Sequence, residues 1–196
     1  MTQKDLVALA NSLPSLHQKN LGDLSANDEG NKRCLGSQWP CSVFNAVWFD
    51  KVKEDWYNTL YFHQVRSADA LYKHGNRYYL IEFKTGKPNN IDIHRKLYDS
   101  IIGLLEHQVL SLSECRENLQ YIIVSLEYKT FPQHQELINH FGFGVEEPWD
   151  YAVTRQNLQD WDKNDIRKLS GFLVNKVYKL SPEDFNAFVS HRNWSN

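Results

Sequence analysis

This sequence of 196 residues is poor in the features of cysteine-stabilised, membrane-spanning and secreted proteins. It has only three cysteines and no CxxC spacing, so we expect reduced structural thiols rather than a disulfide framework or a zinc site. No apolar run approaches the length of a membrane span, and the amino-terminal stretch lacks the basic and continuous apolar regions of a signal peptide. We therefore expect a cytoplasmic protein with no membrane partner.

An excess of one charge sign is also lacking, because 22 basic and 24 acidic side chains leave a net charge of −2. The chain is therefore not a globally basic nucleic-acid binder. Residues 66–96 nevertheless contain seven Lys or Arg and three acids, so this segment is basic and the remainder is acidic. A basic segment suits contact with phosphates; a solvated surface with ordinary charge fluctuation is the alternative. The sequence has no GxGxxG phosphate loop and no GxSxG turn.

The most informative stretch is residues 66–84, RSADALYKHGNRYYLIEFK, which predicts a β-hairpin. Gly75 and Asn76 form a two-residue turn with glycine in the first central position, as a type II′ turn requires. Counting outward from this turn places Asp69 directly opposite Glu82. Because side chains alternate along a strand, Lys84 points to the same face as Glu82. The hairpin thus brings two carboxylates and one ammonium together.

Two facing carboxylates need a compensating partner. About 5 Å apart at an effective dielectric constant of about 20, they repel by about 3 kcal/mol. A divalent cation removes this cost, and oxygen ligands on rigid strands suit Mg²⁺ or Mn²⁺. The structural alternative is an exposed strand end at which a Glu–Lys pair happens to lie near an aspartate.

Hydrophobic periodicity and capping residues predict the elements around this hairpin. Helices are expected at residues 3–13, 43–56, 91–109, 132–141 and 161–175, and from Pro182 onward. Strands are expected at residues 59–65, 119–127, 150–154 and 176–180, with a loop at 20–41. We expect a single α/β domain over residues 1–196, with a central mixed β-sheet flanked by helices.

Asp69, followed after about a dozen residues by Glu82-Phe83-Lys84 on a hairpin, resembles the signature of the PD-(D/E)XK nuclease superfamily. The resemblance covers residues 43–127 and implies a restriction-endonuclease-like core, here with an amino-terminal helix and loop and a carboxyl-terminal helical extension. It also implies metal-dependent phosphodiester hydrolysis of nucleic acid, with DNA as the expected substrate, in bacterial or phage defence or repair.

The resemblance assigns roles to the residues of the signature. Asp69 and Glu82 would ligate Mg²⁺ or Mn²⁺, with the carbonyl of Phe83 as a third ligand. Lys84 would contact the attacking water or the phosphate. Many relatives add a glutamate on the first core helix, where this chain has Asn45, which can ligate through its carbonyl but supplies no charge.

Three further basic residues are candidates for binding nucleic acid: Lys87, Arg95 and Lys96. Arg95 and Lys96 lie on the helix expected after the hairpin, where some relatives hold a phosphate. A solvated helix surface is the alternative for both residues.

Two other function classes remain open. The nuclease fold can serve as a binding scaffold without turnover, in which case it need not keep a metal site. An interaction protein, such as one that neutralises a toxin, is the other alternative, and the acidic remainder of the chain would suit a protein partner.

Overall fold

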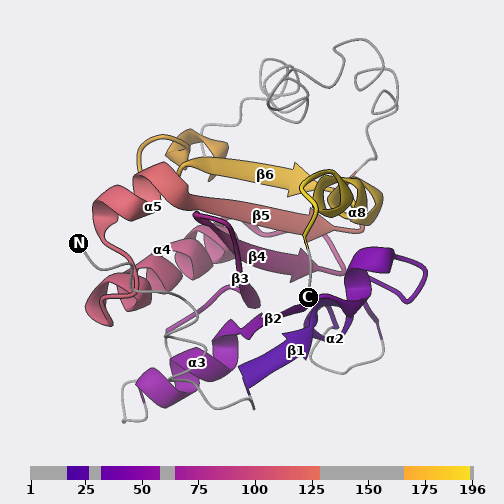
Figure 1. Ribbon diagram of the computed structural model, residues 1–196, viewed down its shortest axis with the longest axis horizontal. Helices are drawn as coiled ribbons and strands as arrows, with labels where there is room; N and C mark the ends of the chain where they lie inside the picture. Colours follow the sequence, from indigo (N-terminus) through magenta and orange to yellow (C-terminus); the bar gives the residue numbers. More distant parts are fainter. Residues whose placement is uncertain (1–16, 27–31, 58–64, 129–165, 195–196) are drawn as a thin grey trace.

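The computed structural model describes residues 17–26, 32–57, 65–128 and 166–194, and a six-stranded sheet lies at its centre (Figure 1). The strands, in spatial as well as chain order, are β1 (Gln18–Asn20), β2 (Asn45–Trp48), β3 (Ala70–His74), β4 (Arg77–Lys84), β5 (Leu119–Ser125) and β6 (Lys176–Leu180). Strands β1 to β4 pair antiparallel, whereas β4, β5 and β6 run parallel. The predicted α/β class with a mixed central sheet is confirmed.

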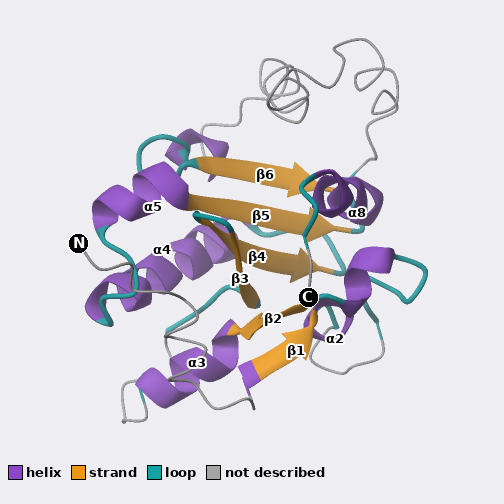
Figure 2. Ribbon diagram, viewed as in Figure 1, coloured by secondary structure: helices purple, strands orange, loops and turns teal. Residues whose placement is uncertain are grey.

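Helices cover both faces of the sheet (Figure 2). They are α2 (Leu21–Leu24), α3 (Phe49–Trp56), α4 (Asn90–Glu106), α5 (Leu112–Asn118) and α8 (Pro182–His191), with 3₁₀ turns η2 (Pro40–Val43) and η5 (Ile166–Leu169). One hydrophobic core lies between the sheet and helices α3, α4 and α5. The other lies between the sheet and helices α2 and α8. Strands β4 and β5 are buried between the two cores, which makes the middle of the sheet a rigid support.

The β3–β4 hairpin has the predicted register. His74 pairs with Arg77, and the pairing continues to the residue that follows Asp69. Gly75 has a φ of 60°, as the first central position of a type II′ turn requires. One further step along this register places Asp69, immediately before β3, opposite Glu82.

The helix predicted over residues 43–56 is wrong in its first half. Residues 45–48 form β2, which pairs with β1 and β3, and α3 begins only at Phe49. Ala46 and Val47 are buried in opposite cores, as successive strand residues are. The spacing of Phe44, Val47 and Trp48 fits a helix, but two neighbouring strands override that local signal.

Three other predictions differ from the structure. The expected loop at 20–41 contains α2 and the end of β1. Helix α5, which has a capping box at Ser111 and Glu114, was not predicted. The helix expected at 161–175 is wrong from residue 170 onward, because the chain turns at Gly171, which has a φ of 74°. Val65, the described end of the strand expected at 59–65, is not in a strand.

The predictions for residues 3–13, 132–141 and 150–154 lie outside the described residues, as does most of 59–65. The remaining expectations are confirmed to within a few residues. The long helix α4 is capped by Asn89, whose side chain accepts the N–H of Ile91 at 2.9 Å. Ser181 caps α8, with Pro182 at the first helical position.

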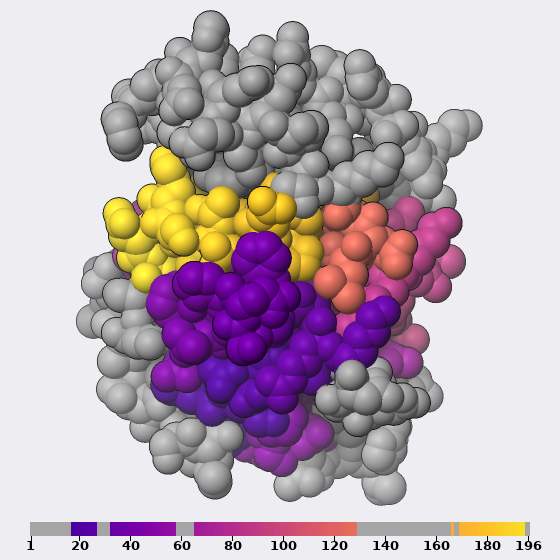
Figure 3. All heavy atoms as spheres, turned by 90° about the vertical axis from the view of Figure 1, so that its right-hand side faces the viewer, coloured from indigo at the N-terminus to yellow at the C-terminus, as the bar shows by residue number. Residues whose placement is uncertain are grey.

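The amino- and carboxyl-terminal parts of the described chain meet beside the carboxyl ends of the parallel strands. Figure 3 shows this side of the molecule, with the early segments in indigo and violet directly against the yellow carboxyl-terminal segment. The backbone N–H of Cys41 in η2 donates to the side chain of Asn186 in α8 at 3.1 Å.

Within the described residues, no helix has the length and apolar character needed to cross a membrane.

Candidate functional site

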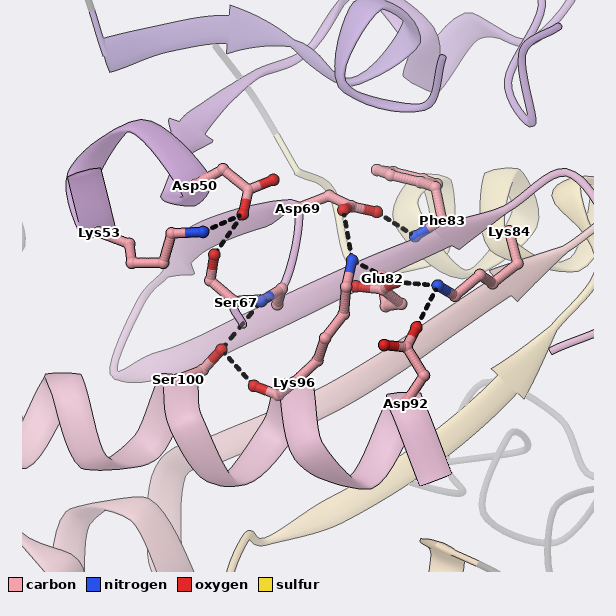
Figure 4. Close-up of polar contacts among 11 residues, drawn as sticks. Asp50, Lys53, Ser67, Asp69, Glu82, Phe83, Lys84, Asp92, Lys96 and Ser100 are labelled. Atoms are coloured by element: carbon pink, nitrogen blue, oxygen red, sulfur yellow. Dashed lines mark hydrogen bonds and ion pairs between the residues drawn. The ribbon is translucent and has the colours of Figure 1, made fainter. Parts of the chain in front are cut away.

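Three predicted site residues converge on the α4 face of the sheet, at the open end of the β3–β4 hairpin (Figure 4). Glu82 and Lys84 are two positions apart on β4, and Nζ of Lys84 lies 2.8 Å from Oε1 of Glu82. Asp69 lies opposite Glu82. The two-residue alternation of the strand places all three side chains on one face, as the turn chemistry predicts.

The segment before β3 is held by side chains of α4 rather than by a partner strand. The backbone N–H of Arg66 donates to Oδ2 of Asp99 at 2.8 Å, and the N–H of Ala68 donates to Oγ of Ser100 at 2.9 Å. Both acceptors satisfy backbone groups that a strand ladder would otherwise pair. Asp69 therefore enters the site from a segment anchored to the helix.

Phe83 contributes its backbone to the site and its ring to the opposite core. Its N–H donates to Oδ2 of Asp69 at 2.6 Å. Its ring packs edge-on against Phe185 of α8, with centroids 6.1 Å apart. The hydrogen bond fixes one oxygen of Asp69, and the other oxygen is directed to a second partner.

That second partner is Lys96 of α4, whose ammonium lies between the two carboxylates. Its Nζ is 3.2 Å from Oδ1 of Asp69 and 2.8 Å from Oε1 of Glu82. The same oxygen of Glu82 therefore forms ion pairs with two ammonium groups, those of Lys96 and Lys84. The sequence predicted a divalent cation at this point, and the structure has a side-chain cation there.

Burial dominates the electrostatics of these groups. Glu82 is fully buried, and burial together with the charge of Asp69 raises the pKa of Glu82 to about 8, against the opposing effect of Lys96 and Lys84. Burial alone would lower the pKa of Lys96, but Asp69 and Glu82 outweigh it and raise the pKa. Burial also opposes the charge on Lys84, but Glu82 and Asp92 outweigh it and raise its pKa, so both lysines stay protonated. Burial raises the pKa of Asp69 as well, so both carboxyl groups bind a proton more readily here than in solution.

A polar cavity of about 410 Å³ opens above these residues. Its lining includes five basic side chains, those of Lys53, Arg66, Lys84, Lys87 and Lys96. It includes three carboxylates, those of Asp50, Asp69 and Asp92. Cations outnumber carboxylates in the lining, so the cavity suits an anionic ligand.

Two of these carboxylates were missed by the sequence analysis. Asp50, in the first turn of α3, accepts a hydrogen bond from the hydroxyl of Ser67 and lies 3.3 Å from Nζ of Lys53. Asp92, in the first turn of α4, lies 3.0 Å from Nζ of Lys84. Acids are common in first turns because they complement the helix dipole, so neither acid carried a specific signal. The helix expected from residue 43 also placed Asp50 in the middle of a helix, whereas α3 begins at Phe49.

The other candidate residues divide between the cavity and the outside. Lys87 lines the cavity. Arg95 lies on the outer side of α4, outside the lining, and pairs with Asp99 at 3.7 Å. Asn45 begins β2 opposite Asn20 of β1 and is also outside the lining.

The described residues contain no group of three or more His, Cys, Asp or Glu side chains arranged to hold a metal ion. They offer two carboxylates, Asp69 and Glu82, and Oε2 of Glu82 is buried without a hydrogen-bond partner. Mg²⁺ commonly takes one or two protein carboxylates and completes its shell with water and phosphate oxygens. The donor set therefore fits such an ion, on the condition that the ammonium of Lys96 moves aside.

Comparisons of the chain with protein-family models, with curated proteins and with solved structures each find no match.

Proposed function

We propose that this protein is a metal-dependent phosphodiesterase of the PD-(D/E)XK type, acting on nucleic acid and preferentially on DNA, in bacterial or phage defence or repair. The observation that carries the proposal is the convergence of Asp69, Glu82 and Lys84 beneath a cavity lined mainly by cations. The free thiols of Cys34, Cys41 and Cys115 support a cytoplasmic location, because reducing compartments preserve them.

In this proposal, Asp69 and Glu82 hold Mg²⁺ or Mn²⁺, and the carbonyl of Phe83 is the third protein ligand. The ion supplies Lewis-acid activation of water and of the scissile phosphate. The unpartnered Oε2 of Glu82 supports a ligand role, since a buried carboxylate oxygen without a hydrogen bond is costly.

Lys84 stabilises the charge that develops on the phosphate. Its side chain is 22% exposed, so it lies at the boundary between the buried carboxylates and the cavity. Asp92 and Glu82 hold its ammonium from two sides, which limits the reorganisation needed during the reaction.

The phosphates flanking the scissile bond have separate partners in the cavity wall. Lys87 and Arg66 line the cavity beside the carboxyl end of β4 and the start of β3. A backbone with one charge per nucleotide would meet these cations without base-specific contacts.

The test is cleavage of labelled single- and double-stranded DNA and RNA with Mg²⁺, Mn²⁺ or EDTA. We expect the wild type to cleave DNA with metal only, and Glu82→Gln to be inactive. Glu127→Gln, at an exposed position, is the matched control and should retain full activity. Absence of cleavage of all four substrates by folded wild type contradicts the proposal.

One observation favours a second candidate, a nucleic-acid- or protein-binding module without turnover, such as a toxin-neutralising protein. The ammonium of Lys96 already pairs with both carboxylates, so the fold has a counter-ion without metal. Binding of DNA or of a protein partner in EDTA, combined with no cleavage under any metal condition, supports this candidate.

A further inference from the structure

The counter-ion of the Asp69–Glu82 pair is a residue of the chain itself. Nζ of Lys96 lies 3.2 Å from Oδ1 of Asp69 and 2.8 Å from Oε1 of Glu82, and its side chain is 14% exposed (Figure 4). A Mg²⁺ ion bound to both carboxylates would occupy the same volume, because its distances to oxygen ligands are shorter still, about 2.0–2.1 Å. Ammonium and metal therefore exclude one another.

The position of Lys96 is built into the fold. The backbone carbonyl of Lys96 accepts a 2.6 Å hydrogen bond from the hydroxyl of Ser100, one turn along α4. The same hydroxyl oxygen of Ser100 accepts a hydrogen bond from the N–H of Ala68. Ala68 precedes Asp69 in the chain. Helix and carboxylate are thus tied together by one buried hydroxyl, which holds the base of the Lys96 side chain beside its partner.

Lys84, the other cation in contact with Glu82, cannot replace Lys96. Lys84 also contacts Glu82, but its ammonium is shared with Asp92. Asp69 has an ion pair with Lys96 and a backbone hydrogen bond from Phe83, and no other ion pair in the described part of the chain. Without the charge of Lys96, the two buried carboxylates would have only the ammonium of Lys84, which Asp92 shares. Such an arrangement needs another cation.

We propose that Lys96 is a built-in counter-cation that competes with Mg²⁺ or Mn²⁺ for Asp69 and Glu82, so that metal enters only when this ammonium swings into the cavity. The inference rests on the proposed function only in taking a divalent cation as the competitor. Asp50 lies on the cavity wall, and its charge acts on Lys96, so a displaced ammonium has a carboxylate within reach.

The main experiment measures metal binding rather than activity. Mn²⁺ affinity is determined by calorimetry for the wild type, for Lys96→Met and for Lys96→Arg, which keeps the charge. We expect Lys96→Met to bind Mn²⁺ at least tenfold more tightly than the wild type, whereas Lys96→Arg stays within threefold of it. Equal affinities in all three proteins would overturn the proposal.

Stability provides a second readout. In EDTA, Lys96→Met should melt several degrees below the wild type and recover most of the loss on addition of Mn²⁺. The double variant Glu82→Gln/Lys96→Met removes both opposite charges, so it should fold in EDTA and bind Mn²⁺ no more tightly than the wild type. Tight binding by the double variant would show that Glu82 is not the contested ligand and would overturn the proposal.

The wild type supplies a measurement that holds even if Lys96→Met does not fold. Labelling by an amine-reactive reagent, quantified by mass spectrometry, should rise severalfold at Lys96 when Mn²⁺ is added. Lys51, on the exposed side of α3, should be unaffected. An unchanged rate at Lys96 under saturating Mn²⁺ would contradict displacement. These results are independent of cleavage, so a wild type without nuclease activity would refute the proposed function and leave the competition standing.

Discussion

The backbone N–H of Phe83 donates a 2.6 Å hydrogen bond to Oδ2 of Asp69 across the open end of the β3–β4 hairpin. Strand pairing between β3 and β4 ends at Ala70 and Ile81, so the side chain of Asp69 takes over where the backbone ladder stops. This contact links the site to the fold, because the same carboxylate uses its other oxygen for Lys96.

Removal of the Asp69 carboxylate should therefore destabilise the protein. Asp69→Ala leaves the backbone N–H of Phe83 without its acceptor and leaves Lys96 with Glu82 as its remaining carboxylate, and we expect it to lower the free energy of unfolding by about 2 kcal/mol. Urea denaturation in EDTA measures the change. Glu127→Ala, an exposed control, should stay within about 0.5 kcal/mol of the wild type. Identical urea midpoints for Asp69→Ala and the wild type would contradict this structural role.

Stability without metal should fall as pH rises from about 4.5 to 8. The pKa of Glu82 is raised from 4.5 to about 8 by burial and by Asp69, so in this window the folded state binds more protons than the unfolded state. The free energy of unfolding then decreases with pH, by about 1.4 kcal/mol per unit where the difference is one full proton.

Glu82→Gln should reduce this slope, because a glutamine has no proton to lose. Asp69, whose pKa burial also raises, adds a slope of the same sign that remains in the variant. Asp92 and Glu114, whose pKa values are lowered, act in the opposite direction only below about pH 4.5 and do not obscure the window. Urea denaturation between pH 5 and 8 tests the difference. Parallel pH profiles for the two proteins would show that Glu82 is not the titrating group.

Millimolar Mg²⁺ or Mn²⁺ should raise the melting temperature of the wild type, because an ion that binds only the folded state stabilises it. At ten times the dissociation constant, the gain is about 1.4 kcal/mol. Asp69→Asn, which removes one ligand charge, should abolish most of the rise. Scanning fluorimetry measures the melting temperature of both proteins with and without metal. An equal rise in both would show that the metal binds at a site that does not include Asp69.

Lys84 and Lys87 should separate turnover from binding. Lys84→Ala should reduce cleavage about a hundredfold with little loss of DNA affinity, because in the proposed function Lys84 acts on charge that develops in the transition state. Lys87→Ala should instead weaken DNA binding and lower its salt dependence, as expected of a phosphate contact. Turnover and affinity are measured for both variants at several salt concentrations. Undiminished turnover in Lys84→Ala would rule out its catalytic role.

Ser100 should contribute to stability through the buried link between α4 and the segment before β3. Ser100→Ala leaves the N–H of Ala68 without an acceptor, and we expect a loss of about 1–2 kcal/mol. Ser113→Ala, which removes an exposed hydroxyl contact to Glu117, is the matched control and should cost less than about 0.5 kcal/mol. A loss no greater than that of the control would show that another group or water satisfies Ala68.

The local sequence was sufficient where one short-range rule decides the geometry. Gly75 specifies the turn, the turn sets the register, and alternation then places Asp69, Glu82 and Lys84 on one face. The capping residues of α8 and the periodicity of α4 are likewise local properties, and both helices were predicted within a few residues.

Long-range contacts decided the rest. Residues 45–48 carry a helix-like pattern, yet they form β2 because strands on both sides supply its hydrogen bonds, and this shift moves Asp50 into the first turn of α3 beside the cavity. Lys96 lies 27 residues from Asp69 in the chain, and no spacing rule indicates that α4 directs its ammonium between the two carboxylates. The sequence alone determined that two carboxylates would need a cation. Only the tertiary structure, by packing α4 against the sheet, supplied that cation from the chain itself.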